Sequence, residues 1–92
     1  MVLDSNTYTV SRGEQVLELP KKEFELLYKL LSYPGQIFTR NQLLDDIWGF
    51  DSESGEDTVK THISRLRNKL RSIEEFRIIT IKGLGYKAEV LE

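Results

Sequence analysis

One stretch of the chain, residues 58–72, restricts the fold more than any other part of the sequence. Its apolar side chains occur only at Val59, Ile63, Leu66 and Leu70. At 100° per residue these four positions lie within about 60° of one another around a helix. The segment therefore predicts a helix with one apolar side that packs on a core and a broad polar side that stays exposed.

The polar side of this predicted helix carries positive charge. Residues 58–72 contain five basic side chains and no acidic one, so no acid–base pair can form within the helix. The net charge of the whole chain is −2, but residues 1–57 hold 5 basic and 11 acidic side chains and residues 58–88 hold 8 and 2. Because salt screens charges beyond about 10 Å at ~0.1 M, the basic C-terminal third matters more for binding than the total charge.

Such a helix suits the major groove of DNA, which is about 12 Å wide and displays a different donor and acceptor pattern for each base pair. Arginine and asparagine side chains can pair with base edges, while hydroxyls and neighbouring bases hold phosphates. The alternative is a solvated amphipathic helix whose bases only keep the protein soluble.

Composition excludes several other classes of protein. The 92 residues, 39% of them hydrophobic, suit one globular domain with a modest core. The chain has no cysteine and a single histidine, so neither a disulfide framework nor a zinc site is expected. The apolar runs are far shorter than the ~20 residues that cross a bilayer, and Met1–Asn6 lacks the features of a signal peptide. We therefore expect a cytoplasmic protein that does not contact a membrane.

No pattern of residues indicates an enzyme. The sequence shows no paired nucleophile and base, no glycine-rich phosphate loop that opens a helix and no cluster of metal ligands. We expect neither catalytic activity nor a bound cofactor.

The rest of the chain predicts short strands, two further helices and a hairpin. Pro20 suits the start of a helix, Thr39 and Gln42 can form a capping box for the next one, and Asp57 or Thr58 is expected to cap the helix that runs to about Ser72. The remaining elements are expected as strands at 2–3, 7–10 and 15–19, an extended link at 37–38, helices at 21–33 and 39–48, and hairpin strands at 78–81 and 86–90 around a glycine-containing turn.

Three stretches of the sequence together resemble one known family. They are "KEFELLYKLLSYPGQIFTRNQLLDDIWG", "TVKTHISRLRNKL" and "ITIKGLGYK", and the resemblance is to the DNA-binding effector domain of OmpR/PhoB-type two-component response regulators. It implies an α+β winged helix-turn-helix domain over residues 1–92, with a four-stranded N-terminal antiparallel sheet, three helices and a C-terminal β-hairpin wing. The receiver domain that the family fuses to this domain is absent from this chain.

The resemblance also implies a set of DNA-binding residues, with the third helix in the major groove and the wing at the adjacent minor groove. Carried over by motif, the contacts are Trp48, Thr58, His62, Arg65, Arg67, Thr80, Lys82, Gly83 and Tyr86. The helical wheel adds Thr61 and Lys69, which lie on the same flank as Thr58. The alternatives are a surface histidine at His62, a core aromatic ring at Trp48 and an ordinary surface hairpin.

The same resemblance implies further partners. Family members bind tandem direct repeats as dimers when a sensor kinase has phosphorylated the receiver domain. The acidic loop before the third helix can meet RNA polymerase, and Asp51 and Glu53 are the candidate contacts; a merely solvated loop is the alternative. Another alternative for the whole chain is a winged helix that binds protein instead of DNA.

Overall fold

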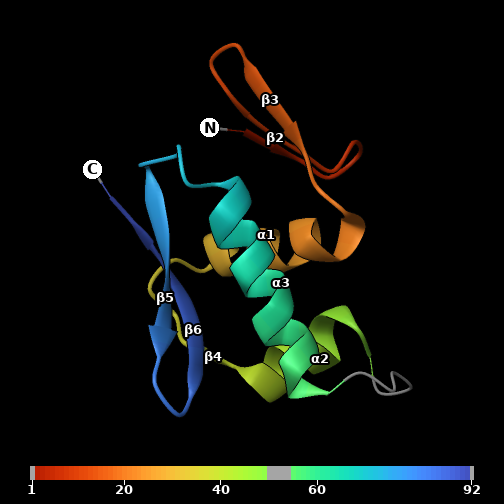
Figure 1. Cartoon of the computed structure of the whole chain (residues 1–92), viewed down its shortest axis with the longest axis vertical. Helices are drawn as coiled ribbons and strands as arrows, with labels where there is room; N and C mark the ends of the chain where they lie inside the picture. Colours follow the sequence, from red (N-terminus) through yellow and green to blue (C-terminus); the bar gives the residue numbers. More distant parts are fainter. Residues whose placement is uncertain (1, 50–54, 92) are drawn as a thin grey trace.

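The computed structural model describes residues 2–49 and 55–91. They form, in chain order, β1 (Val2–Asp4), β2 (Thr9–Arg12), β3 (Gln15–Glu18), α1 (Lys21–Ser32), β4 (Phe38–Thr39), α2 (Arg40–Ile47), α3 (Glu56–Lys69), β5 (Phe76–Ile81) and β6 (Gly85–Val90). Figure 1 shows β2 and β3 at one end of the molecule, the helices in the middle and the β5–β6 hairpin beside α3. The predicted winged-helix architecture is confirmed.

The N-terminal sheet is antiparallel, with the strand order β1-β2-β3. Val10 lies opposite Leu3 and Leu17, and this row of apolar side chains faces the core. β2 begins two residues later than expected because Tyr8 adopts a left-handed backbone with φ 54° in the preceding turn. The three strands that the residue pattern predicts are present, whereas the fourth strand that the resemblance implies does not occur among the described residues.

The first two helices form much of the core and begin where the sequence predicts. α1 follows Pro20 and buries Phe24, Leu27 and Leu30. At the start of α2 the Thr39 hydroxyl accepts a hydrogen bond from the Gln42 backbone N–H (3.1 Å), and the Gln42 side-chain oxygen accepts one from the Thr39 N–H (2.9 Å). The predicted capping box is therefore confirmed.

Helix α3 buries the apolar side that the sequence predicts, but its ends differ from the expectation. The relative exposures of Val59, Ile63, Leu66 and Leu70 are 0%, 1%, 0% and 6%. The predicted cap at Asp57 or Thr58 is wrong, because Gly55 is the N-cap and no side chain caps the helix. Asp57 in the first turn suits the positive end of the helix dipole, and glycine is an accepted N-cap.

The same helix ends at Lys69, earlier than the predicted Ser72, with Leu70 as its C-cap. Leu70 is buried, and the chain turns back directly after it, where the Ile73 N–H donates to the Leu70 carbonyl. This early turn brings Phe76 into the core at the start of β5, two residues before the expected start of that strand.

The C-terminal sheet has the order β4-β6-β5, so the hairpin gains a third, two-residue strand. The sequence predicted Ile37 and Phe38 only as an extended link. β4 pairs with β6 at Thr39 and Gly85, where a Cβ on Gly85 would lie 1.9 Å from the Phe38 carbonyl oxygen. Glycine is therefore required here for the close approach of two backbones, whereas Gly83 in the turn has φ 75° and supplies the left-handed conformation that the turn needs.

Candidate nucleic-acid interface

The exposed side of α3 is framed by two other elements. Thr61, Ser64, Arg65 and Asn68 are exposed and lie opposite the buried seam of the helix; we call these four residues the α3 stripe. On one flank of the stripe, His62 contacts Trp48 at the end of α2. On the other flank, Arg67 contacts β5. The stripe therefore lies between the end of α2 and the hairpin.

The hairpin and α3 are arranged so that one elongated partner could contact both. Figure 1 shows the β5–β6 turn at the same end of the molecule as the N-terminal end of α3. The predicted wing residues Lys82 and Gly83 lie in this turn and are exposed. Thr80 is exposed on β5, whereas Tyr86 on β6 is 4% exposed. The Tyr86 ring is thus part of the core, and a DNA contact at this residue stays a prediction.

The histidine ring is fixed in place by its neighbours. His62 Nδ1 lies 2.7 Å from the carbonyl oxygen of Thr58, one turn earlier. Its ring meets the Trp48 ring edge-to-face, with centroids 4.9 Å apart and an interplanar angle of 76°. Because a carbonyl oxygen can only accept, Nδ1 carries the proton in the neutral ring and Nε2 is then an acceptor. His62 can therefore donate to a phosphate through Nε2 only when the ring is protonated.

Trp48 has the core-packing role that the sequence left open, and its DNA contact stays a prediction. It is partly buried and packs against the hydrophobic core. It is also the C-cap of α2, where its backbone N–H donates to carbonyls of the last turn. The ring lies against His62 and so belongs to the flank of the α3 stripe.

Arg67 makes the most extensive polar contacts of the predicted site residues. Its Nε and Nη2 atoms donate to the Ile78 carbonyl at 3.3 and 2.8 Å, and Nη2 also donates to the Thr80 hydroxyl at 2.7 Å. The guanidinium carbon lies 5.9 Å from the centroid of the Tyr86 ring. The structure therefore brings together three predicted residues from α3, β5 and β6.

Lys69 lies apart from the other predicted residues. It is in the last turn of α3, and its ammonium group donates to both carboxylate oxygens of Glu23 at 2.9 and 3.1 Å. Sequence reasoning missed Glu23, which is 2% exposed and lies 46 positions away in the chain. A DNA contact at Lys69 stays a prediction, but part of its charge is balanced within the fold.

The acidic segment before α3 is only partly described. Asp51 and Glu53, the predicted polymerase contacts, lie outside the described residues. Asp57 is exposed in the first turn of α3, where a carboxylate stabilises the helix through its dipole.

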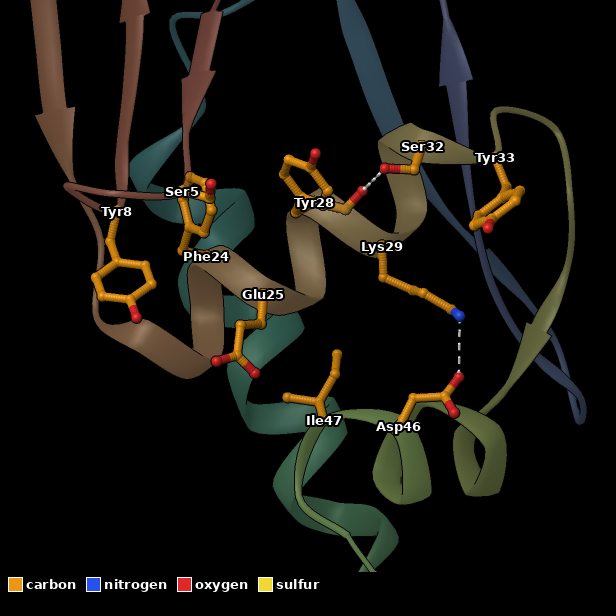
Figure 2. A pocket seen from close by; sticks show the side chains of 10 residues that line it. All are labelled: Ser5, Tyr8, Phe24, Glu25, Tyr28, Lys29, Ser32, Tyr33, Asp46 and Ile47. Carbon is orange, nitrogen blue, oxygen red and sulfur yellow. Dashed lines mark hydrogen bonds and ion pairs between the residues drawn. The ribbon is translucent and has the colours of Figure 1, made fainter.

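A groove of about 590 Å³ lies away from these residues, between the β1–β2 turn, α1 and the end of α2 (Figure 2). Tyr8, Phe24 and Tyr28 contribute aromatic rings, and Lys29 forms an ion pair with Asp46 at 3.2 Å. The groove contains none of the predicted DNA contacts.

The described residues contain neither a cluster of metal ligands nor a membrane-spanning helix. Within residues 2–49 and 55–91, no group of three or more histidine or acidic side chains is placed to hold a metal ion. In the same residues no helix has the length and apolar character needed to cross a bilayer.

Comparison with known proteins identifies the family. Residues 13–88 match the family described as "Transcriptional regulatory protein, C terminal". The chain belongs to this family. The predicted resemblance to OmpR/PhoB-type effector domains is thereby confirmed, and with it the prediction of a DNA-binding domain that serves transcription regulation.

Curated relatives agree with this membership. The chain is 42% identical over 90 residues to the heme response regulator HssR of Staphylococcus saprophyticus, and the match covers 97% of this chain and 40% of the relative. HssR of Staphylococcus aureus is 41% identical with the same coverage. The chain thus spans about two fifths of the length of these regulators.

Solved structures of response-regulator domains share the fold. The DNA-binding domain of Bacillus subtilis CssR has a TM-score of 0.81 at 26% identity, covering 95% of this chain and 97% of that one. The DNA-binding domain of Klebsiella pneumoniae RstA, solved in complex with the RstA box, has a TM-score of 0.78 at 31% identity, covering 95% and 88%.

Proposed function

We propose that this domain binds duplex DNA sequence-specifically by placing the α3 stripe in the major groove and the β5–β6 turn on the neighbouring backbone or minor groove. The observation that carries the proposal is the position of the exposed stripe between the hairpin and the end of α2. A single straight duplex could contact all three elements, and DNA-bound RstA shares the fold.

Within this arrangement the side chains divide by reach and chemistry. Arg65 and Thr61 are exposed on the stripe, where an arginine can pair bidentately with guanine and a hydroxyl can bond to base or phosphate. Thr58, His62 and Trp48 are partly buried at the edge of the stripe, so phosphates that line the groove are their natural partners. Lys82 and the backbone at Gly83 are available at the tip of the wing.

For the complete regulator we infer a response regulator whose receiver domain is phosphorylated by a sensor kinase in the cytoplasm. Two copies then bind tandem direct repeats, and the acidic loop contacts RNA polymerase. Two observations support this inference. The chain belongs to the family, and its match covers 40% of the length of a relative named as a response regulator. A single effector domain should bind DNA more weakly than the paired full-length protein. In the pair, binding of the first copy raises the effective concentration of the second copy at the neighbouring repeat.

The test is selection of binding sites from random duplexes, followed by fluorescence anisotropy with the selected duplex across a range of salt concentrations. We expect one enriched motif, and a log–log salt slope of about −0.9 for each phosphate that the protein neutralises. A shuffled duplex of equal length is the control. Failure to enrich any motif, combined with salt-independent binding, would contradict the proposal and favour a protein-binding winged helix.

The polymerase contact needs a separate experiment. The double variant Asp51→Ala and Glu53→Ala should reduce transcription from a cognate promoter and leave DNA affinity unchanged, because acidic side chains suit a basic polymerase surface. An equal loss of transcription and of DNA affinity would contradict this role.

A further inference from the structure

We propose that Arg67 is a positioning residue that ties α3 to the wing and fixes the angle between them, in addition to lying beside the DNA-binding surface. The proposal rests on the proposed function, because the wing matters for binding only if α3 and the β5–β6 turn contact the same duplex.

The hydrogen bonds of Arg67 cross from the helix to the hairpin. Three of the five guanidinium N–H groups have acceptors on β5: Nε and one Nη2 hydrogen reach the Ile78 carbonyl, and the other Nη2 hydrogen reaches the Thr80 hydroxyl. A planar fork that bonds two acceptors on one strand restrains both the distance and the rotation of that strand relative to the helix.

The position of the acceptors shows which part of the wing is restrained. Ile78 and Thr80 lie on β5, and Thr80 is opposite Tyr86 in the hairpin. The guanidinium also lies over the Tyr86 ring. The contact therefore reaches both hairpin strands just before the turn that carries Lys82, so a small rotation at this point would be enlarged at the tip.

α3 and the hairpin share the buried core, but at the surface they are not packed closely everywhere. A surface groove of about 280 Å³ separates the end of α3 from β5 and is lined by Arg67, Leu70, Phe76 and Ile78 among others. The backbone of β6 packs against α1 and pairs with β4. These contacts anchor the hairpin through β6, whereas the described hydrogen bonds between α3 and β5 all come from the Arg67 side chain.

A contact that acts through the wing differs from an independent phosphate contact in one measurable way. If Arg67 only held a phosphate, its removal and the removal of Lys82 would weaken DNA binding additively, since the two side chains do not share a partner. If Arg67 positions the wing, its removal displaces Lys82 as well, and the second loss costs much less once the first has occurred.

The experiment is a double-mutant cycle on the selected duplex with Arg67→Met and Lys82→Ala, and a matched cycle with Arg65→Met and Lys82→Ala. Lys82→Ala alone should weaken binding about 10-fold, and less than about 2-fold in the Arg67→Met background. In the Arg65→Met background it should keep its full effect, because Arg65 has the same charge on the same helix, whereas the described hydrogen bonds from α3 to the hairpin all come from Arg67. Additivity in both cycles would overturn the proposal.

A second measurement requires no DNA. Residual dipolar couplings of backbone amides in free wild type and Arg67→Met report the orientation of β5–β6 relative to α3. We expect a reorientation of the hairpin in the variant, with the α1–α2 couplings unchanged; identical couplings would overturn the proposal. If the wild type bound no duplex at all, the proposed function would fail, while this measurement would still decide whether Arg67 holds the wing.

Discussion

The ammonium group of Lys69, at the end of α3, donates to both carboxylate oxygens of Glu23 in the first turn of α1. Glu23 is 2% exposed, whereas the Lys69 side chain is 36% exposed. The pair joins the helix that carries the stripe to the helix that forms much of the core. Among the contacts described for the buried Glu23 carboxylate, Lys69 is its only partner.

Removal of Lys69 should therefore destabilise the domain. Lys69→Met leaves the Glu23 carboxylate buried without its cation, and we expect a loss of about 1–3 kcal/mol in the free energy of unfolding, less than for a fully buried pair because water reaches the lysine. Urea denaturation measures the loss. The double variant Glu23→Gln and Lys69→Met should recover much of it; a double variant as unstable as the sum of the single variants would contradict the pairing.

The two glycines near the wing should differ in their tolerance of a methyl group. Gly83→Ala places a side chain at positive φ and should cost about 1–2 kcal/mol. Gly85→Ala forces β4 and β6 apart, since the added Cβ would lie 1.9 Å from a carbonyl oxygen, and should cost at least about 3 kcal/mol. Thermal unfolding of both variants provides the comparison. Equal losses would show that the β4–β6 approach is looser than the structure has it.

Two cationic side chains should have different effects on DNA recognition. Arg65→Ala should relax preference at one or two base pairs and cost about 1–3 kcal/mol on the selected site, whereas Lys82→Ala should weaken binding by a similar factor on all duplexes and reduce the salt slope by about 1. Anisotropy on the selected duplex and on single-base variants measures both effects. Wild-type affinity and preference in both variants would contradict the site assignment.

The tautomer of His62 is also open to direct test. Long-range ¹H–¹⁵N correlation spectra of the free domain should place the proton of the neutral ring on Nδ1, where it is donated to the Thr58 carbonyl. A neutral ring protonated on Nε2 would be incompatible with the observed contact.

Local sequence patterns predicted the features that depend on neighbours along the chain. The apolar seam of α3 and the capping box at Thr39 both follow from spacings of three or four residues, and both are confirmed. The start of α3 was wrong because several neighbouring residues can cap a helix, and Gly55 competes with Asp57 for that position.

Contacts between distant parts of the chain could not be predicted in the same way. β4 exists only because Phe38 and Thr39 meet β6 more than forty residues later. The Glu23–Lys69 pair and the Arg67 bonds to β5 likewise depend on how helices and hairpin pack in space. Arg67 and Lys69 were predicted as DNA contacts, Arg67 by motif and Lys69 by its place on the helical wheel. The sequence alone could not show that both have partners within the protein.

The most direct test of a DNA-binding surface made of α3 and the wing is an NMR titration of the ¹⁵N-labelled domain with the selected duplex. Amide shifts should concentrate at residues 58–65 of α3 and 80–84 of the wing, and the amides of β1–β3 should stay in place. Shifts confined to the N-terminal sheet or to the groove at Tyr8 and Tyr28 would contradict the account.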